Sequence, residues 1–130
     1  ITPTVARDSS TLDIPSFNPL DRMYIPAGAT HFKIINAIAA LSDFEYNSTT
    51  KVYEPKDSTT NGLTDVQDSG YLSVNASTGL ISVVSTLSGS PTISADVSVV
   101  NLLAVEFYQE VNSNYYLFAQ GNAMKVAKIF

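Results

Sequence analysis

Residues 92–111 read TISADVSVVNLLAVEFYQEV, and this stretch decides the fold. Apolar side chains recur at every second position, first as Ile93, Ala95, Val97 and Val99, and then as Leu103, Val105, Phe107 and Val111. A period of two is typical of a β-strand with one face in a core and the other in solvent. We therefore predict strand structure throughout this stretch, with Gln109 as the one polar residue on its apolar face.

The sequence that follows predicts a hairpin and a final strand. Asn112-Ser113-Asn114 supplies the turn, because asparagine tolerates the positive φ angles of tight hairpin turns. Tyr115 to Phe118 then returns along the preceding strand. The chain ends on the apolar pair Ile129-Phe130, so we expect Ala123 to Phe130 to be tied into a sheet.

The long apolar segment from His31 to Tyr46 is predicted to be a strand that is buried on both sides. Both of its faces are mostly apolar: Phe32, Ile34, Ile38 and Ala40 lie on one, and Ile35, Ala37, Ala39 and Leu41 on the other. Asn36 interrupts the first face. A helix is the alternative, and the β-branched residues at the start of the segment favour the strand.

The polar middle of the chain predicts short strands and exposed loops. Lys51 to Tyr53 is predicted to be a short strand, and Lys56 to Gly70 an exposed loop. Tyr71 to Val74 and Leu80 to Leu87 flank Asn75 to Gly79, which we interpret as a hairpin turn.

Residues 1–23 differ from the remainder because they contain three prolines and only short apolar groupings. Proline restricts strands to sheet edges and strand ends, so this segment predicts an extended amino-terminal arm or two short edge strands. Residues 24–130 are predicted to form one domain. The predicted fold is all-β, a two-sheet antiparallel β-sandwich of jelly-roll-like type with about eight to ten strands.

The charge and composition exclude several classes of function. The net charge is −5 and Lys and Arg form no cluster, so the basic surface that nucleic-acid binding requires is missing. No apolar run approaches the roughly 20 residues of a membrane span, so we expect no membrane insertion. Cysteine is absent, which excludes disulfides and thiolate chemistry.

The polar residues also indicate a location. Charged residues make up only 15% of the chain, and Ser, Thr and Asn take their place. Exposed strand faces of extracellular β proteins often carry Ser and Thr, so we expect an extracellular or cell-surface location. Because the chain begins at Ile1 and not at Met, we also expect a processed form or a piece of a longer protein.

Three stretches of sequence resemble one family. They are PAGATHFK at 26–33, DFE at 43–45 and VEFYQEVN at 105–112. The chain resembles, over residues 10–130, the carboxy-terminal β region of a family of uncharacterised Bacteroidota proteins. Ser113 stands where that pattern usually has glycine, so we expect a somewhat less tight hairpin. The resemblance implies a source and a β fold, and it implies no activity.

We predict no catalytic residue and no enzyme. His31 is the only histidine, no nucleophile-elbow pattern is present, and a structural residue at a strand start is the simpler interpretation. The carboxylate pairs Asp43 with Glu45 and Glu106 with Glu110 have the residue types of a glycoside hydrolase. However, strand alternation alone places such pairs on a solvated face.

We predict no cofactor and no metal, with a single calcium site as the alternative. Asp57, Asp65 and Asp68 fall in the polar loop, and calcium prefers several such oxygen ligands. Their spacing matches no recognised calcium loop.

Two further groups of residues are candidate sites. Tyr108, Tyr115 and Tyr116 are ligand-binding candidates, because aromatic side chains are enriched at protein and sugar interfaces. Asn47 and Asn75 match the N-glycosylation pattern, and Ser58 lies in a tripeptide that resembles the O-glycosylation motif of secreted Bacteroidota proteins.

The leading functional hypothesis is a structural subunit that self-associates into a homo-oligomer, a filament or an array. Unpaired strand edges need a cover, and an arm from one subunit is able to add a strand to its neighbour. The apolar side chains that would anchor such an arm in its neighbour are those of Ile1, Val5, Leu12 and Ile14. The alternatives are an adhesion module that binds carbohydrate or a protein partner, and a jelly-roll virus or phage coat protein.

Overall fold

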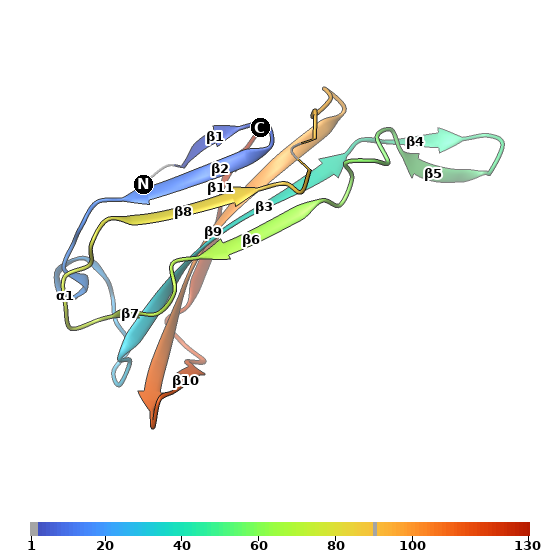
Figure 1. The fold of residues 1–130 in the computed structure, drawn as a ribbon. Coiled ribbons are helices and arrows are strands. Elements are labelled where there is room, and N and C mark those ends of the chain that lie inside the picture. The colour runs from blue at the N-terminus through green and yellow to red at the C-terminus, as the bar shows by residue number, and fades with distance from the viewer. Residues whose placement is uncertain (1–2, 90) are drawn as a thin grey trace.

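The computed structural model describes residues 3–89 and 91–130. Strands make up 54% of these residues and helix 3%, which confirms the predicted all-β class. The strands form two packed antiparallel sheets and a separate hairpin (Figure 1). The described residues contain one four-residue helix, α1 (Pro19–Arg22), and no helix among them is long and apolar enough to cross a membrane.

The larger sheet is built on two long central strands, β3 (His31–Ser42) and β9 (Val97–Val111). They pair along the full length of β3, from His31 opposite Tyr108 to Ser42 opposite Val97. Shorter strands flank them on both sides. These are β6 (Thr64–Asp68) and β7 (Leu72–Ser73) beside β3, and β10 (Asn114–Leu117) and β11 (Ala123–Ile129) beside β9.

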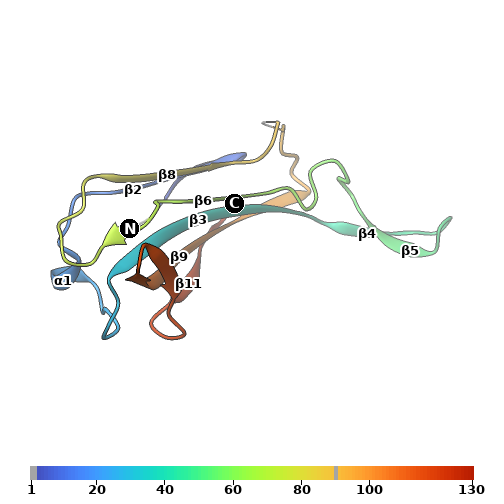
Figure 2. The same cartoon turned by 60° about the horizontal axis from the view of Figure 1, so that its bottom comes forward.

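The smaller sheet has three strands in the order β1 (Thr4–Ala6), β2 (Ser9–Ile14) and β8 (Ile81–Thr86). It lies across one face of the larger sheet, which we call the inner face (Figure 2). The sandwich is therefore two layers deep. The third pair of strands, β4 (Phe44–Asn47) and β5 (Val52–Pro55), forms a hairpin that projects beyond it (Figure 1).

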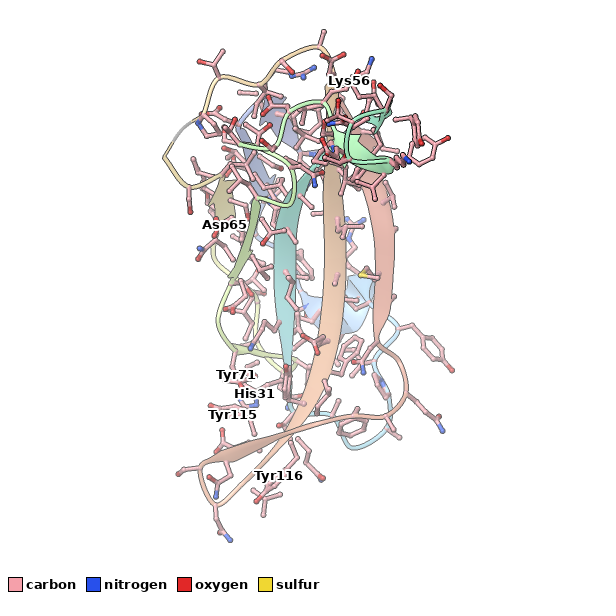
Figure 3. The ribbon with its side chains drawn as sticks, turned by 90° about the vertical axis from the view of Figure 1, so that its right-hand side faces the viewer. His31, Lys56, Asp65, Tyr71, Tyr115 and Tyr116 are labelled. Atoms are coloured by element: carbon pink, nitrogen blue, oxygen red, sulfur yellow. The ribbon has the colours of Figure 1, made fainter. Side chains whose placement is uncertain are left out.

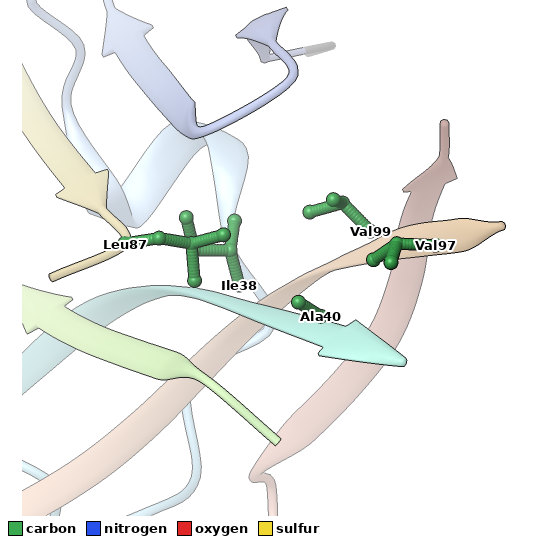
Figure 4. Packing of buried hydrophobic residues seen from close by; sticks show 5 residues of the cluster. All are labelled: Ile38, Ala40, Leu87, Val97 and Val99. Carbon is green, nitrogen blue, oxygen red and sulfur yellow. The ribbon is translucent and has the colours of Figure 1, made fainter. Parts of the chain in front are cut away.

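The core lies between the two sheets and follows from strand alternation. Every second residue of β3 and β9 faces the smaller sheet, so Phe32, Ile38 and Phe107 are almost fully buried. Leu12 and Val83 face them from the smaller sheet. At one end of the sandwich, the side chains of Ile38, Ala40, Leu87, Val97 and Val99 form one packed cluster (Figure 4).

A buried polar network crosses the middle of this core. The side-chain nitrogen of Asn101 donates to Oδ1 of Asn36 at 2.7 Å, and the nitrogen of Asn36 donates to the Ser10 carbonyl at 3.1 Å. The Ser10 hydroxyl donates to Oδ1 of Asn101 at 2.9 Å, and the Ser85 hydroxyl to the Asn36 carbonyl at 2.5 Å. All four residues are completely buried. Because two belong to each sheet, the network fixes how the sheets lie on one another.

The amino-terminal segment forms two short strands, as one of the two predictions stated, but only β1 lies at a sheet edge. Its described residues form β1, β2 and α1, and β2 lies in the middle of the smaller sheet. The proline argument placed both strands at edges, but β2 contains no proline because it ends at Ile14, directly before Pro15. The segment therefore packs against its own chain.

Three local predictions were also wrong. Asn75 to Gly79 is not a hairpin turn, because it connects β7 of the larger sheet with β8 of the smaller one. Lys56 to Gly70 is not all loop, since it contains β6. Residues 92–96 are not strand, because β9 begins only at Val97, where the side chains start to alternate between core and solvent.

Several other elements are confirmed. His31 to Ser42 is strand and not helix. Asn112 and Ser113 have φ angles of 53° and 65° and join β9 to β10, which confirms the predicted hairpin turn. The turn is a tight two-residue turn although Ser113 led us to expect a looser one. The carboxyl terminus is tied into the sheet, because Phe130 and Val99 exchange two backbone hydrogen bonds of 2.9 and 2.7 Å.

Candidate functional site

The face of the larger sheet that points away from the smaller sheet carries the most unusual surface of the molecule. We call it the outer face. Its central part is apolar and consists of Ile35, Ala37, Ala39, Leu41, Val66, Val100, Leu102, Ala104, Met124, Val126 and Ile129, which share this face by their pairing. Among residues 3–89 and 91–130, no strand or helix packs over it (Figure 2).

The sequence predicted the opposite for the part of this face that β3 contributes. Because both faces of β3 are apolar, burial on two sides was expected, yet Leu41 is 52% exposed. On the flanking strands, Val66 is 63% exposed and Met124 is 71% exposed. Residues on the central strands, such as Leu102 and Ile35, are half-buried only by their neighbours in the sheet. An uncovered apolar face of this width is a feature of proteins that bind another surface.

The edge of the larger sheet at β11 is better protected than its face. Two lysines, Lys125 and Lys128, lie on this strand, and the pairing with β9 shifts between Val126 and Lys128. Charged side chains and a bulge on an edge strand both discourage edge-to-edge pairing. We therefore regard the outer face, and not the β11 edge, as the exposed surface most in need of a cover.

At the β10 end, the outer face changes from aliphatic to aromatic. The Tyr71 and Tyr115 rings stack with their centroids 3.8 Å apart and an interplanar angle of 3°. The Tyr108 ring meets Tyr71 edge-on at 4.9 Å, and the His31 ring meets Tyr115 edge-on at 5.1 Å. Figure 3 shows His31, Tyr71 and Tyr115 gathered at this end of the sheet. We call this group, together with Lys33, the aromatic cluster.

A cation lies at the centre of the aromatic cluster. The Lys33 ammonium group is 4.5 Å from the Tyr71 ring centroid and 3.9 Å from a carboxylate oxygen of Asp68. Burial lowers the pKa of Lys33, but the neighbouring Tyr108, Asp68 and Tyr71 outweigh it and leave this pKa raised. The lysine thus stays charged at neutral pH, where a cation over an aromatic face is attracted by the ring.

Two of the phenol groups are also perturbed. Desolvation raises the pKa of Tyr108, with Lys33 opposing and Glu106 adding to the shift. Desolvation and then the charge of Glu110 raise the pKa of Tyr115. Both phenols are therefore neutral hydrogen-bonding groups at physiological pH.

His31 has a positioning role in this arrangement. Its Nδ1 lies 2.9 Å from the Thr30 hydroxyl oxygen, and its Nε2 lies 3.8 Å from a Glu110 carboxylate oxygen. The backbone N–H of Glu110 also donates to the Thr30 hydroxyl at 2.8 Å. The imidazole thus projects from the start of β3 toward the β9–β10 hairpin and borders the aromatic cluster.

The predicted ligand-binding tyrosines are divided by the structure. Tyr108 and Tyr115 belong to the aromatic cluster, whereas Tyr116 pairs with Gln109 and points to the opposite face, where it is 56% exposed. Tyr71 was missed, because it precedes β7 and reaches the cluster only through the pairing of β7 with β3. No local sequence signal reports such a long-range contact.

The three aspartates of the calcium hypothesis serve separate local roles. The Asp57 carboxylate accepts the backbone N–H groups of Thr59 and Thr60, and Asp65 accepts that of Thr86 at 2.9 Å. Asp68 lies beside Lys33. Within residues 3–89 and 91–130, no three acidic, histidine or cysteine side chains come together as a metal-binding group.

Two glycosylation candidates, Ser58 and Asn75, lie in turns, and the third, Asn47, is the last residue of β4. Asn75 and Ser58 are exposed. Asn47 is half-buried, and its side-chain nitrogen donates to Glu54 at 3.0 Å. This bond and one from Thr50 lower the pKa of Glu54. Modification of Asn47 would therefore have to break a contact inside the β4–β5 hairpin.

The candidates for strand addition lie mostly inside the molecule. Leu12 and Ile14 face the core from β2, and Leu12 is only 1% exposed. Val5 is half-buried on β1. Ile1 lies outside the described residues. The described side chains of this group pack within their own chain, so their insertion into a neighbouring subunit would require the smaller sheet to open.

The fold places the chain in the class of all-β, two-sheet sandwich proteins. A scan against protein-family models, a search of curated proteins and a search of solved structures found no match to it. The resemblance to a Bacteroidota family stays a prediction.

Proposed function

We propose that this protein is a non-enzymatic structural subunit of an extracellular or cell-surface assembly, and that two copies associate through the outer face of the larger sheet. The observation that carries the proposal is the uncovered apolar surface around Val66, Leu102 and Met124. Burial of such surface away from water is the main driving force of protein association.

The size of the outer face suits a second copy of the chain. At about 4.8 Å between strands and about 3.3 Å per residue, β6, β3, the part of β9 that pairs with β3, and β11 together span about 570 Å². Two copies would then bury roughly 1,100 Å² in total, which exceeds the roughly 1,000 Å² that a specific interface requires. Sheets stack face to face at about 10 Å, and a two-fold axis lets one patch cover its own copy.

This route of association replaces exchange of the amino-terminal arm as the favoured one. Exchange through β2 would take Leu12 out of the core and Ser10 out of the buried network. Stacking of outer faces leaves the core intact. The Ser and Thr residues on the solvent side of the smaller sheet, including Ser9, Thr11 and Ser82, support an extracellular setting for the other side of the subunit.

The test compares matched valine substitutions on the two outer surfaces. Val66 lies on the outer face, whereas Val84 lies on the solvent side of the smaller sheet and is 48% exposed. Light scattering should give the wild-type protein and Val84→Lys at least the mass of a dimer, and Val66→Lys a shift toward the monomer. A monomeric wild-type protein at about 100 μM, well above the dissociation constant of a stable dimer, would contradict the proposal.

The aromatic cluster supports a second candidate function, an adhesion module that binds carbohydrate. Stacked tyrosines beside a cation and carboxylates have the apolar faces and polar groups that a sugar ring requires. On a glycan array, Tyr115→Ala and Tyr71→Ala should lose binding, and Tyr116→Ala should keep it because Tyr116 points to the opposite face. An array without hits for the wild-type protein removes this candidate.

A further inference from the structure

The inner face of the larger sheet is not fully covered by the smaller sheet, which sits mainly over β3 and β6. Between β2 and β11, a groove therefore opens over the inner side of β9. It has a narrow part of about 320 Å³ beside Leu103 and a wide part of about 770 Å³ beside Phe17. Ile34 and Val105 line both parts, so the two parts are continuous.

The lining of the groove changes along its length. In the narrow part, Lys125 is the one polar residue among the nine that line it, and the other eight are apolar. In the wide part, Arg22 joins Lys125. Among the described residues, no carboxylate lines either part. The groove is thus mostly apolar in its narrow part and more strongly cationic in its wide part.

The two cations of the groove have no acidic partner within residues 3–89 and 91–130. The ion pairs of this part of the chain involve His31, Lys33 and Lys56, and neither Arg22 nor Lys125 takes part in one. The whole chain carries 12 acidic and 7 basic residues, so a cationic lining runs against its overall charge. A ligand with an anionic group complements this lining, whereas a cationic ligand would be repelled.

The chemistry of the narrow part favours an alkyl chain over a peptide. A peptide carries backbone N–H and C=O groups, which cost free energy when they leave water without a hydrogen-bonding partner. The lining of the narrow part offers only Lys125 as a polar side chain, and the neighbouring β11 edge is protected. An alkyl chain has no such groups, and its transfer from water onto Ile34 and Val105 is favourable. A volume of about 320 Å³ also lies in the range of small-molecule sites.

We propose that the groove binds a single-chain amphiphile with an anionic headgroup, of the class of the long-chain fatty carboxylates. The alkyl chain lies in the narrow part, against Ile34, Leu103 and Val105. The carboxylate lies in the wide part, where Arg22 and Lys125 attract it. The ligand is a free amphiphile and not a lipid within a membrane, because a chain with a net charge of −5 is repelled by an anionic membrane surface.

This site is independent of the proposed dimer, because the groove and the outer face lie on opposite sides of the larger sheet. Failure of one proposal therefore leaves the other standing. Each subunit would have two binding surfaces, one for a second copy and one for the amphiphile.

The test is a calorimetric titration with octanoate, decanoate and laurate, each below its micelle concentration. Affinity should rise about two- to fourfold for each added methylene group that enters the narrow part. Dodecyltrimethylammonium, which has the chain of laurate and the opposite charge, should bind more weakly than laurate. Amide NMR shifts locate the site, and we expect the largest shifts with laurate at Ile34, Leu103 and Val105.

Charge variants test the role of the two cations. Arg22→Glu and Lys125→Glu should each weaken laurate binding about fivefold, the scale of one exposed ion pair, and the double variant should prefer dodecyltrimethylammonium. Lys128→Glu is the matched control, because Lys128 lies on the same strand as Lys125 but does not line the groove. Val66→Lys is the control for the outer face. Both controls should bind laurate as the wild-type protein does.

Four outcomes would overturn the proposal. The first is no binding of laurate at about 1 mM. The second is binding that does not depend on chain length or on Lys125, and the third is binding that is lost in Val66→Lys, which would place laurate on the outer face. The fourth is a different occupant. Binding to phosphatidylglycerol vesicles in place of laurate would indicate a membrane surface, and groove shifts that follow protein concentration alone would indicate a second copy.

Discussion

The side-chain amide of Asn101 donates to Oδ1 of Asn36 across 2.7 Å at the centre of the sandwich, and neither residue has any exposed surface. The two residues lie on neighbouring strands of the larger sheet. Through Ser10 and Ser85 they also reach the smaller sheet. Buried polar groups are costly unless every donor and acceptor has a partner, so this network tolerates only one placement of the sheets.

The first prediction is that Asn101→Ala lowers the free energy of unfolding by about 2 to 3 kcal/mol. The substitution removes the short bonds of Asn101 to the Ser10 hydroxyl, to Asn36 Oδ1 and to the Ala37 carbonyl. It leaves the Ser10 hydroxyl and Asn36 Oδ1 only their longer contacts of 3.3 and 3.5 Å. A buried group that loses its partner costs about 1 to 3 kcal/mol. Urea unfolding measures the change. Asn114→Ala is the control, because Asn114 is exposed at the start of β10 and should change stability by less than about 0.5 kcal/mol.

The second prediction concerns the packing of the amino-terminal segment within its own chain. Leu12→Ala should destabilise the protein by about 2 to 5 kcal/mol, because Leu12 is fully buried and the surroundings collapse only partly into the cavity. The mass in light scattering should not change before unfolding. A variant that keeps its stability but changes its oligomeric mass would show that β2 packs against a neighbouring subunit instead.

The third prediction is a loss of stability at alkaline pH. The pKa values of Tyr108, Tyr115 and Lys33 are all raised in the folded state. A group with a raised folded-state pKa stabilises the fold below its ordinary pKa, and this contribution disappears as the pH rises through the folded value. The ordinary values are 10.0 for tyrosine and 10.5 for lysine, so stability should fall above pH 10.

Absorbance at about 295 nm follows the ionisation of the phenols and checks this assignment. Glu110→Gln should lower the pKa of Tyr115 toward its ordinary value, because the negative charge of Glu110 adds to the effect of desolvation. Tyr108 should respond less, since Glu106 and not Glu110 is its acidic neighbour. A Tyr115 titration that is unchanged in Glu110→Gln would contradict the described contact.

Strand periodicity accounts for the part of the fold that the sequence predicts. The apolar residues of 97–111 alternate because one face of β9 lies in the core. For β3, whose two faces are both apolar, the β-branched residues at the start of the segment favoured the strand. In contrast, the central position of β2 and the contact of Tyr71 with Tyr115 depend on pairing between segments far apart in the chain. Alternation along one strand carries no information about which other strand lies beside it.

The candidate site was harder to predict for a related reason. An apolar face of a strand indicates that something covers it, but not whether the cover comes from the same chain. The outer side of β3 therefore looked like a buried face, although no described element covers Ile35 and Ala37. Asn36 was visible only as an interruption of the apolar pattern. Its partner Asn101 became recognisable once the register of β3 and β9 placed the two residues together.

The last prediction is that Ser113→Gly stabilises the protein by about 0.5 to 1 kcal/mol. Asn112 and Ser113 both have positive φ angles, as a two-residue hairpin turn requires, and glycine adopts such angles without the steric cost that serine bears. Ser113→Ala is the control, because alanine keeps the Cβ atom and should bring no gain. Urea unfolding of the three proteins should show a higher midpoint with an unchanged slope for Ser113→Gly alone. Equal midpoints would mean that the turn changes its conformation when the strain is released.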